Sequence, residues 1–356
     1  MTELHALLGD CHRRVDTATG TVVESDTLDG RRLECVAADG AGRVFVGTFD
    51  AGLWRSTDGG ETFEQVSLDE TFERASLDET FERASLDETT SPGETASPPA
   101  VTAVAVAADD PAEVWVGTEP SGVYRSTDGG ETFARRPGLT DLDSADEWSF
   151  PPRPDTHHVR WLAPDPSDPD RWYVAVEAGA LVRTPDRGMT WRDRVADGPR
   201  DTHTIATHPD RPETAWVAAG DGFAVTTDGG ETWSFPTAGL ERTYCWSLAV
   251  DPDDPDRLLV SAARSAREAH TAARAETYVY RRAGDDWERL DGRGLPLGEG
   301  VTRPVLCRGG DAGECFALSN RGLFRTTDWG DSWEAVGVEW PERVETGTAR
   351  GLTVVE

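Results

Sequence analysis

Gly52-Leu-Trp-Arg-Ser-Thr-Asp58-Gly-Gly-Glu-Thr-Phe63 is the first copy of a pattern that recurs along the chain. Three further copies nearly coincide with it, at residues 122–133, 222–233 and 322–333, and a looser copy lies at 180–191. Each copy has Ser or Thr two residues before an aspartate, glycine two residues after it, and then Ser or Thr followed by Trp or Phe. A pattern that repeats at this scale predicts a fold built from similar units.

Each copy predicts a hairpin. Apolar and β-branched residues before the aspartate favour a strand, and the glycine after it supplies the positive φ that a tight turn needs. The carboxylate can accept backbone N–H groups across that turn. The alternative is that these aspartates are acids or metal ligands, but their repetition at equivalent places argues for a structural role. They are Asp58, Asp128, Asp186, Asp228 and Asp328.

Two further strand patterns precede each copy, so that one unit is a four-stranded meander, the blade of a β-propeller. Successive aspartates are 70, 58 and 42 residues apart, whereas Asp228 and Asp328 are 100 apart, a distance that suits two blades. A degenerate copy at residues 280–287 keeps the strand and the Trp. The spacing therefore predicts six blades between residues 35 and 336.

The two ends of the chain supply a seventh blade. Residues 4–8, 13–17 and 21–24 predict three strands, and 351–356 predict a lone strand that closes the ring and removes exposed sheet edges. We therefore predict an all-β, seven-bladed propeller as a single domain over 1–356. Within it, residues 64–100 form an acidic, low-complexity loop insertion, because the nine residues at 67–75 recur in tandem at 76–84.

The composition excludes several classes of protein. The chain has 66 acidic against 35 basic residues, a formal net charge of −31, and all of the basic residues are arginine. Such a charge repels phosphate and anionic membranes, so we expect neither nucleic acid nor a membrane as partner. Acid spread along the whole chain favours a halophilic surface adapted to high salt. We further expect a cytoplasmic monomer without a metal or cofactor.

The repeated pattern resembles the Asp-box, or BNR, repeat of sialidases, sortilin-type receptors, xyloglucanase-type glycosidases and photosystem assembly factors. The resemblance implies a propeller and a structural Asp box. It leaves two classes of function open, a non-catalytic binding or assembly scaffold and a glycoside hydrolase, so the sequence does not decide whether the protein is an enzyme.

In a propeller meander, the residues before each innermost strand converge at one mouth of the central channel. In this acidic chain, the residues at that mouth include several arginines and histidines. Positive side chains that face one space attract an anion, so we predict a site for an acidic small molecule, an acidic sugar or a protein partner. The alternative is that these arginines pair with Asp155, Asp201 and Glu241. The residues expected to bind are Arg160, Arg200, Arg242, Arg303 and Arg350 with His157, His158, His203, His270 and Tyr244, and Arg31, Arg32 and Arg153 precede the same strands.

The hydrolase alternative needs its own residues. Sialidases use a Tyr–Glu pair as nucleophile, three arginines that hold a carboxylate, and an aspartate as acid. By this resemblance the catalytic candidates are Tyr244, Glu241 and Asp201.

Overall fold

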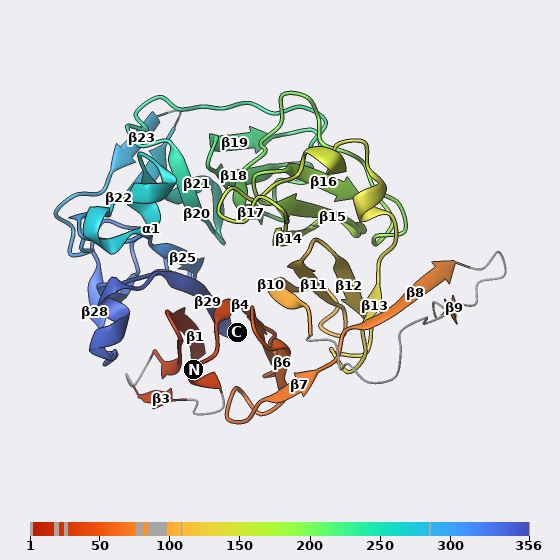
Figure 1. Ribbon diagram of the computed structural model, residues 1–356. Coiled ribbons are helices and arrows are strands. Elements are labelled where there is room, and N and C mark those ends of the chain that lie inside the picture. Colours follow the sequence, from red (N-terminus) through yellow and green to blue (C-terminus); the bar gives the residue numbers. More distant parts are fainter. Residues whose placement is uncertain are drawn as a thin grey trace.

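The computed structural model describes residues 3–17, 21–24, 28–75, 81–84, 98–107, 109–284 and 286–355. In these residues seven sheets, mostly antiparallel, are arranged around a central axis (Figure 1). The predicted seven-bladed propeller is therefore confirmed. None of the described helices has the length and apolar character that crossing a membrane requires.

The blade that joins the two ends of the chain contains β1 (Glu3–Leu8), β2 (Cys11–Asp16), β3 (Val22–Glu24) and β29 (Ala349–Val355). β29 is its innermost strand and pairs antiparallel with β1, from Glu3 opposite Val355 to Leu8 opposite Ala349. The prediction that N-terminal strands and one C-terminal strand close the ring is confirmed.

The other blades follow in chain order. The first holds β4 (Leu33–Ala38), β5 (Val44–Thr48), β6 (Gly52–Ser56) and β7 (Glu64–Val66). The second holds β10 (Ala100–Val106), β11 (Val114–Glu119), β12 (Val123–Ser126) and β13 (Ala134–Arg135). The third holds β14 (Val159–Asp165), β15 (Asp168–Val176) and β16 (Ala180–Thr184), and the fourth β17 (Thr202–Thr207), β18 (Ala215–Ala219) and β19 (Gly222–Thr226).

The fifth and sixth blades complete the ring. The fifth holds β20 (Tyr244–Asp251), β21 (Asp254–Ala263), β22 (Glu276–Ala283) and β23 (Asp286–Arg289), with the short β24 (Gly298–Glu299) beside β22. The sixth holds β25 (Val305–Arg308), β26 (Cys315–Ser319), β27 (Gly322–Thr326) and β28 (Glu334–Val336). Between β21 and β22 lies the helix α1 (Ala266–His270).

Two blades depart from the predicted four strands. In the third and fourth blades the outer strand is reduced to isolated bridges, Arg183 with Arg192 and Val225 with Ser234. In the fourth blade Pro236 follows soon after the bridge, and proline has no N–H with which to extend a ladder.

The predicted loop insertion contains two strands in its described part. β8 (Asp69–Ala75) runs parallel to β13, and β9 (Phe81–Ala84) pairs with β8, so the sheet of the second blade has six strands. β8 extends outward from the ring (Figure 1). The short β13 leaves an outer edge with which a further strand can pair. Residues 76–80 and 85–97 of the insertion lie outside the described residues.

The Asp-box turns share one geometry. In the second blade, Asp128 accepts hydrogen bonds from the Ser126 hydroxyl at 2.7 Å, from the backbone N–H groups of Glu131 and Thr132 at 3.0 and 2.9 Å, and from the Thr132 hydroxyl at 2.6 Å. The other four aspartates accept the same kind of bonds from the Ser or Thr on either side. The threonine hydroxyl bonds lower the pKa of Asp58 and of Asp228 to about 2.

The core lies between neighbouring blades. Trp115 of the second blade stacks on Trp172 of the third, with ring centroids 4.5 Å apart, and Phe223 of the fourth meets Trp287 of the fifth at 4.8 Å. Because each blade packs only on its two neighbours, the seven innermost strands are left to line the central channel: β4, β10, β14, β17, β20, β25 and β29.

Candidate functional site

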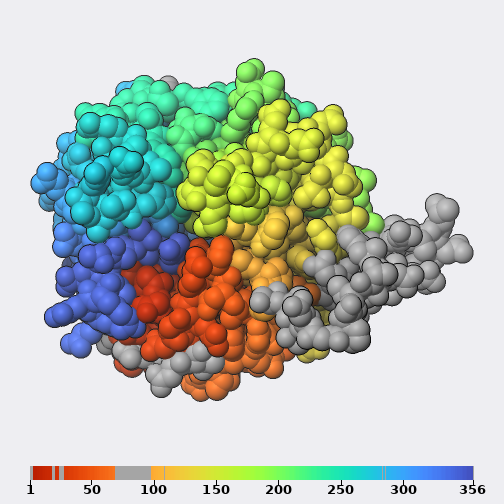
Figure 2. Space-filling view, in the orientation of Figure 1, coloured from red at the N-terminus to blue at the C-terminus, as the bar shows by residue number. Residues whose placement is uncertain are grey.

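All seven innermost strands begin at the same end of the channel, and most of them carry a polar residue into a cavity there. The cavity has a volume of about 160 Å³. Its charged lining consists of Arg32, Glu34, Arg153, Arg160, Glu177, Arg303 and Arg350. We call it the arginine cavity. Figure 2 shows one face of the molecule, and segments that are far apart in the sequence meet around the centre of that face.

Arg303, just before β25, is the most enclosed of the five arginines, with 3% of its surface exposed. Its Nε donates to His270 Nδ1 at 3.0 Å and its Nη1 to the Ala349 carbonyl at 2.7 Å. No carboxylate of the described residues lies within ion-pair distance of its guanidinium. Burial, together with the charges of Arg160 and Arg350, lowers the pKa of Arg303. Since arginine stays protonated in proteins, this is a buried charge that no carboxylate of the described residues contacts directly, although the charge of Glu177 acts on it from a greater distance.

Two neighbouring arginines are only partly neutralised. Arg160 of β14 approaches Glu177 through its Nε at 3.6 Å, and Arg350 of β29 approaches Glu34 of β4 at 3.2 Å. In both contacts one carboxylate faces one guanidinium, without a bidentate pair.

The remaining two arginines lie toward the opening. Arg153 has a close bidentate contact with Glu119, and the exposed Arg32 lies over the Phe49 ring at 4.0 Å. Five arginines thus face three carboxylates, Glu34, Glu119 and Glu177, which leaves an excess of positive charge at the cavity in a chain of formal charge −31.

Trp246 of β20 supports the two innermost cations. The guanidinium carbon of Arg303 lies 3.6 Å from the centroid of the indole ring, and that of Arg160 lies 4.9 Å from it. The ring is 4% exposed, and the electron-rich face of tryptophan attracts cations in a desolvated setting. This stacking fixes the direction of both guanidinium groups toward the cavity.

A chain of hydrogen bonds runs from Arg303 into the wall. Since Arg303 donates to His270 Nδ1, the proton of a neutral His270 is on Nε2, which lies 3.2 Å from the Tyr244 hydroxyl. That hydroxyl is 3.3 Å from His203 Nε2, and His203 Nδ1 donates to the Cys245 carbonyl at 2.7 Å. Burial and the Arg303 charge lower the pKa of His270 to about 2, and burial raises the pKa of Tyr244. His270 and Tyr244 are therefore neutral at pH 7.

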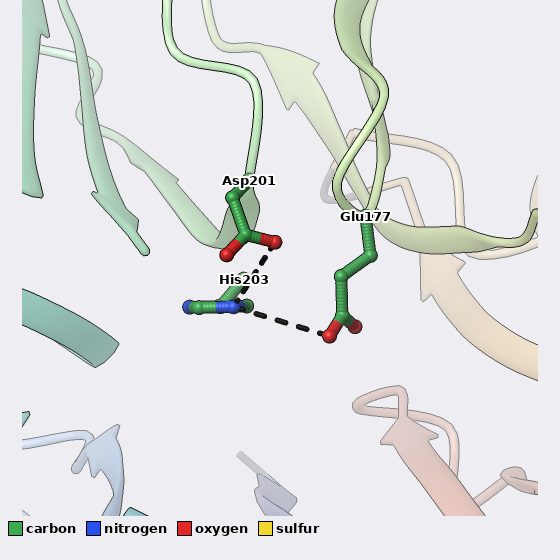
Figure 3. A group of neighbouring side chains, drawn as sticks. All are labelled: Glu177, Asp201 and His203. Carbon is green, nitrogen blue, oxygen red and sulfur yellow. Dashed lines mark ion pairs between the residues drawn. The ribbon is translucent and has the colours of Figure 1, made fainter. Parts of the chain in front are cut away.

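Glu177, Asp201 and His203 meet behind the cavity (Figure 3). His203 Nε2 lies 3.6 Å from Asp201 and 4.0 Å from Glu177, and both carboxylates point toward the imidazole. Glu177 also contacts His158 Nε2 at 3.0 Å. Burial alone would raise the pKa of Glu177, but this bond and the nearby positive charges lower it.

The same three groups are of the types that bind transition metals, and one ligand atom from each lies within 4.8 Å of the others. Glu177 is already engaged by His158 and Arg160, and further arginines surround it, which opposes an added cation. We therefore assign no metal to this group.

The structure brings together part of the predicted set. Arg160, Arg303, Arg350, His158 and His270 line the arginine cavity, and so do Arg32 and Arg153. His203, Tyr244 and Asp201 lie behind this lining, in contact with it.

Other predicted residues lie elsewhere. Arg242 pairs with Glu276 at 2.7 Å within its own blade, and the backbone N–H groups of the exposed Arg200 and of Asp201 donate to Asp221. The exposed Glu241 pairs with Arg289 at 2.9 Å, so it does not lie beside Tyr244 as a catalytic partner would. His157 packs edge-on against Trp148.

Arg31 also lies away from the cavity, over the Trp54 ring. These residues precede their strands in loops, and none of them is among the residues that line the arginine cavity.

Sequence reasoning missed Glu177, Glu119 and Trp246 as site residues. Glu177 ends the apolar run Val174-Ala-Val-Glu177, directly after β15. An acid at the end of a buried strand was the available signal, because β15 runs antiparallel to β14 and so ends at the same mouth.

Comparisons with known proteins agree with this architecture. The family model described as BNR/Asp-box repeat matches residues 224–235, in the fourth blade. The oligoxyloglucan-reducing end-specific xyloglucanase of Emericella nidulans is 26% identical over 159 residues, which are 39% of this chain and 18% of that protein. A xyloglucanase of a Paenibacillus species is 29% identical over 149 residues, 35% of this chain and 14% of that protein. The matched segment is thus a small part of both curated relatives.

Two solved structures extend the likeness to most of the chain. The GH74 xyloglucanase from Xanthomonas campestris aligns with a TM-score of 0.64 at 16% identity, over 99% of this chain and 52% of that one. The structure of YCF48 bound to D1 peptide aligns with a TM-score of 0.53 at 17% identity, over 85% and 82% of the two chains. At these identities the solved structures show the fold alone. Together with the repeat match, they confirm the resemblance of this chain to Asp-box propellers.

Proposed function

We propose that this chain is a binding propeller whose arginine cavity takes the negatively charged group of an acidic ligand or partner. The observation that carries the proposal is Arg303, a buried guanidinium flanked by Arg160 and Arg350 without a carboxylate of its own. An anion bound there would relieve the mutual repulsion of the three arginines.

The size of the cavity limits what it takes. Pockets for drug-sized ligands have volumes of roughly 300–1,000 Å³, and the arginine cavity has about 160 Å³. It suits one carboxylate or a group of similar size, presented by a small molecule, a sugar acid or a peptide. YCF48, a propeller of similar fold solved with a peptide bound, supports a binding role for this architecture.

A second candidate is a glycoside hydrolase, favoured by the likeness to xyloglucanases and by the neighbouring carboxylates of Glu177 and Asp201. A glycosidase needs a general acid whose pKa is raised. The pKa of Glu177 is lowered instead, by its contacts with His158, His203 and Arg160. The geometry therefore supports binding better than hydrolysis.

Titration calorimetry tests the binding proposal. We expect acetate, succinate, glucuronate or sialic acid to bind the full chain and glucose not to bind. Replacing Arg303 by Ala should weaken binding by about 2–5 kcal/mol, roughly 30-fold or more, because one partner of a desolvated charge pair is lost. Arg350→Ala, at a less buried position, should also weaken carboxylate binding. It serves as the second test if Arg303→Ala does not fold.

Arg242→Ala and Arg200→Ala are matched controls, since both arginines lie outside the cavity, and their affinity should equal that of the unchanged protein. Equal loss in all four variants would contradict the proposal. Release of sugar from xyloglucan oligosaccharide or sialyllactose, abolished by Glu177→Gln, would favour the hydrolase instead.

A further inference from the structure

The other end of the central channel holds a larger chamber. It has a volume of about 670 Å³, which is within the range of pockets for organic ligands. Its wall is made mainly by the later residues of the innermost strands, among them Leu162, Ile205, Leu248, Leu306 and Leu352. We call it the apolar chamber.

A narrower cavity of about 60 Å³, the waist, lies between the two. It shares Arg160, Trp246 and Arg350 with the arginine cavity, and it shares Trp161, Leu162, Thr204, Leu306 and Leu352 with the apolar chamber. Arginine cavity, waist and apolar chamber are therefore successive parts of one channel.

Polar side chains of the waist bond to the neighbouring blade. Thr204 Oγ1 donates to the Trp246 carbonyl at 2.9 Å, and Ser247 Oγ accepts from the Leu306 N–H at 2.9 Å. These bonds join the fourth blade to the fifth and the fifth to the sixth. Because the hydroxyls are used in this way, the wall offers a passing ligand mostly apolar surface.

The lining of the channel thus changes from charged to apolar along β14 and β29. On β14, Arg160 faces the arginine cavity, and Ala163 and Pro164 line the apolar chamber. Three to four residues of strand separate these ends, a distance of roughly 10–13 Å at 3.3 Å per residue. A ligand that fills the channel needs one charged end and an apolar body of about that length.

We propose that the channel binds an amphipathic monocarboxylate of the fatty-acid type. Its carboxylate would be held by Arg303, Arg160 and Arg350, and its alkyl chain would pass the waist into the apolar chamber. This inference rests on the proposed function and names its ligand class. A dicarboxylate of the same length fits less well, because its second charge would lie in a chamber that is mostly apolar and whose charged lining is Asp109, Asp165 and Arg308.

A chain-length series tests the inference. Acetate, butanoate, octanoate and dodecanoate are titrated into the full chain by calorimetry, below their micellar concentrations. Each added methylene that is buried should tighten binding by about threefold to fourfold. Dodecanol and dodecanedioate, which lack the charge or carry a second one, should bind much more weakly than dodecanoate.

One variant distinguishes binding of the alkyl chain in the waist and apolar chamber from binding of the carboxylate in the arginine cavity. Leu352→Trp narrows the waist, and it should leave acetate binding unchanged while removing the gain with chain length. Phe235→Trp, at an exposed apolar position away from the channel, is the control and should behave as the unchanged protein. If Leu352→Trp does not fold, Leu306→Trp probes the same wall.

The outcomes distinguish the two proposals. If acetate binds and longer chains bind no better, the fatty-acid inference is overturned and the proposed function stands. If no carboxylate binds, the proposed function itself fails. Dodecanol that binds as tightly as dodecanoate would overturn the inference, because the arginines would then contribute nothing.

Discussion

The Asp-box turns and the arginine cavity lie at opposite ends of the blades. The turns are held by the same local bonds in each blade, whereas the cavity combines different residues from several blades. An Asp box follows the third strand of its blade, which runs in the same direction as the innermost strand, so it lies at the end away from the cavity. There, five aspartates make the same local bonds to residues within four positions of themselves. In the cavity, Arg160, Arg303 and Arg350 come from three blades and have different partners.

This difference explains why the Asp-box turns can be predicted from the sequence and the arginine cavity cannot. A structural turn has to be made in each blade, so its residues repeat and become a pattern. A binding site is needed once, and each blade supplies a different part of it. The same ring therefore carries repeated residues in its Asp-box turns and unrepeated residues around the cavity for which we propose a ligand.

Salt should have the largest effect, and it should change folding stability and carboxylate binding in opposite directions. We expect folding to need molar KCl, with the melting temperature rising from low to molar salt, because salt screens the self-repulsion of a chain of charge −31. Carboxylate affinity should fall over the same range, since salt also screens the arginines and chloride competes for them. Thermal unfolding and calorimetry at matched salt measure both. A melting temperature independent of salt would exclude the halophilic interpretation.

Removing one Asp-box carboxylate should affect stability and leave binding intact. Asp128→Ala loses the bonds from Ser126, Glu131 and Thr132, and we expect a cost of about 1–3 kcal/mol in the free energy of unfolding, measured with urea. Glu131→Ala, on the same turn, should change stability by less than about 0.5 kcal/mol. Carboxylate affinity lost in Asp128→Ala would show that the two regions are not independent.

Acid should destabilise the two regions in different pH windows. His270 has a pKa of about 2 in the folded protein against 6.5 unfolded, so the unfolded state takes up the proton first and stability falls as pH drops below 6.5. The loss is up to about 1.4 kcal/mol per pH unit, and it should be smaller in His270→Gln. Asp58 and Asp228 have folded pKa values of about 2 against 3.8, so their contribution is lost only between about pH 4 and 2.

Urea unfolding of both proteins from pH 7 to about pH 2 measures these windows. Parallel pH profiles for the unchanged protein and for His270→Gln would mean that His270 is not buried as a neutral group.

The insertion should matter least. Deleting residues 67–91 and rejoining the ends with a short Gly/Ser link should leave the fold intact, because loop closure changes by only about 0.6 kcal/mol per doubling of length. In the part of the insertion that the structure describes, β8 pairs with the two-residue β13 and with β9 and with no other strand. The melting temperature checks this. A large decrease would show that the segment packs on the second blade.

The fold was largely predictable because its decisive interactions are local. Each box places a strand, a turn and an aromatic residue within twelve positions, and box spacing then counts the blades. The outer strands of the third and fourth blades were not predictable in this way, since single bridges replaced the expected ladder.

The site was predictable only in part. Topology places the residues before each innermost strand at one mouth, which located Arg160, Arg303 and Arg350. It does not determine where a loop side chain points, and Arg242 turned to Glu276. Glu177 lies on a different connection of its blade and becomes a neighbour of His203 only when two blades pack together.

The last strand of the ring also carries the last residue of the site. β29 joins the ring by pairing with β1, and the same strand brings Arg350 to Glu34 and the arginine cavity. The cavity is therefore incomplete until β29 has been made and has paired with β1. A ligand that needs Arg350 would bind only the closed ring and would stabilise the closed ring by mass action.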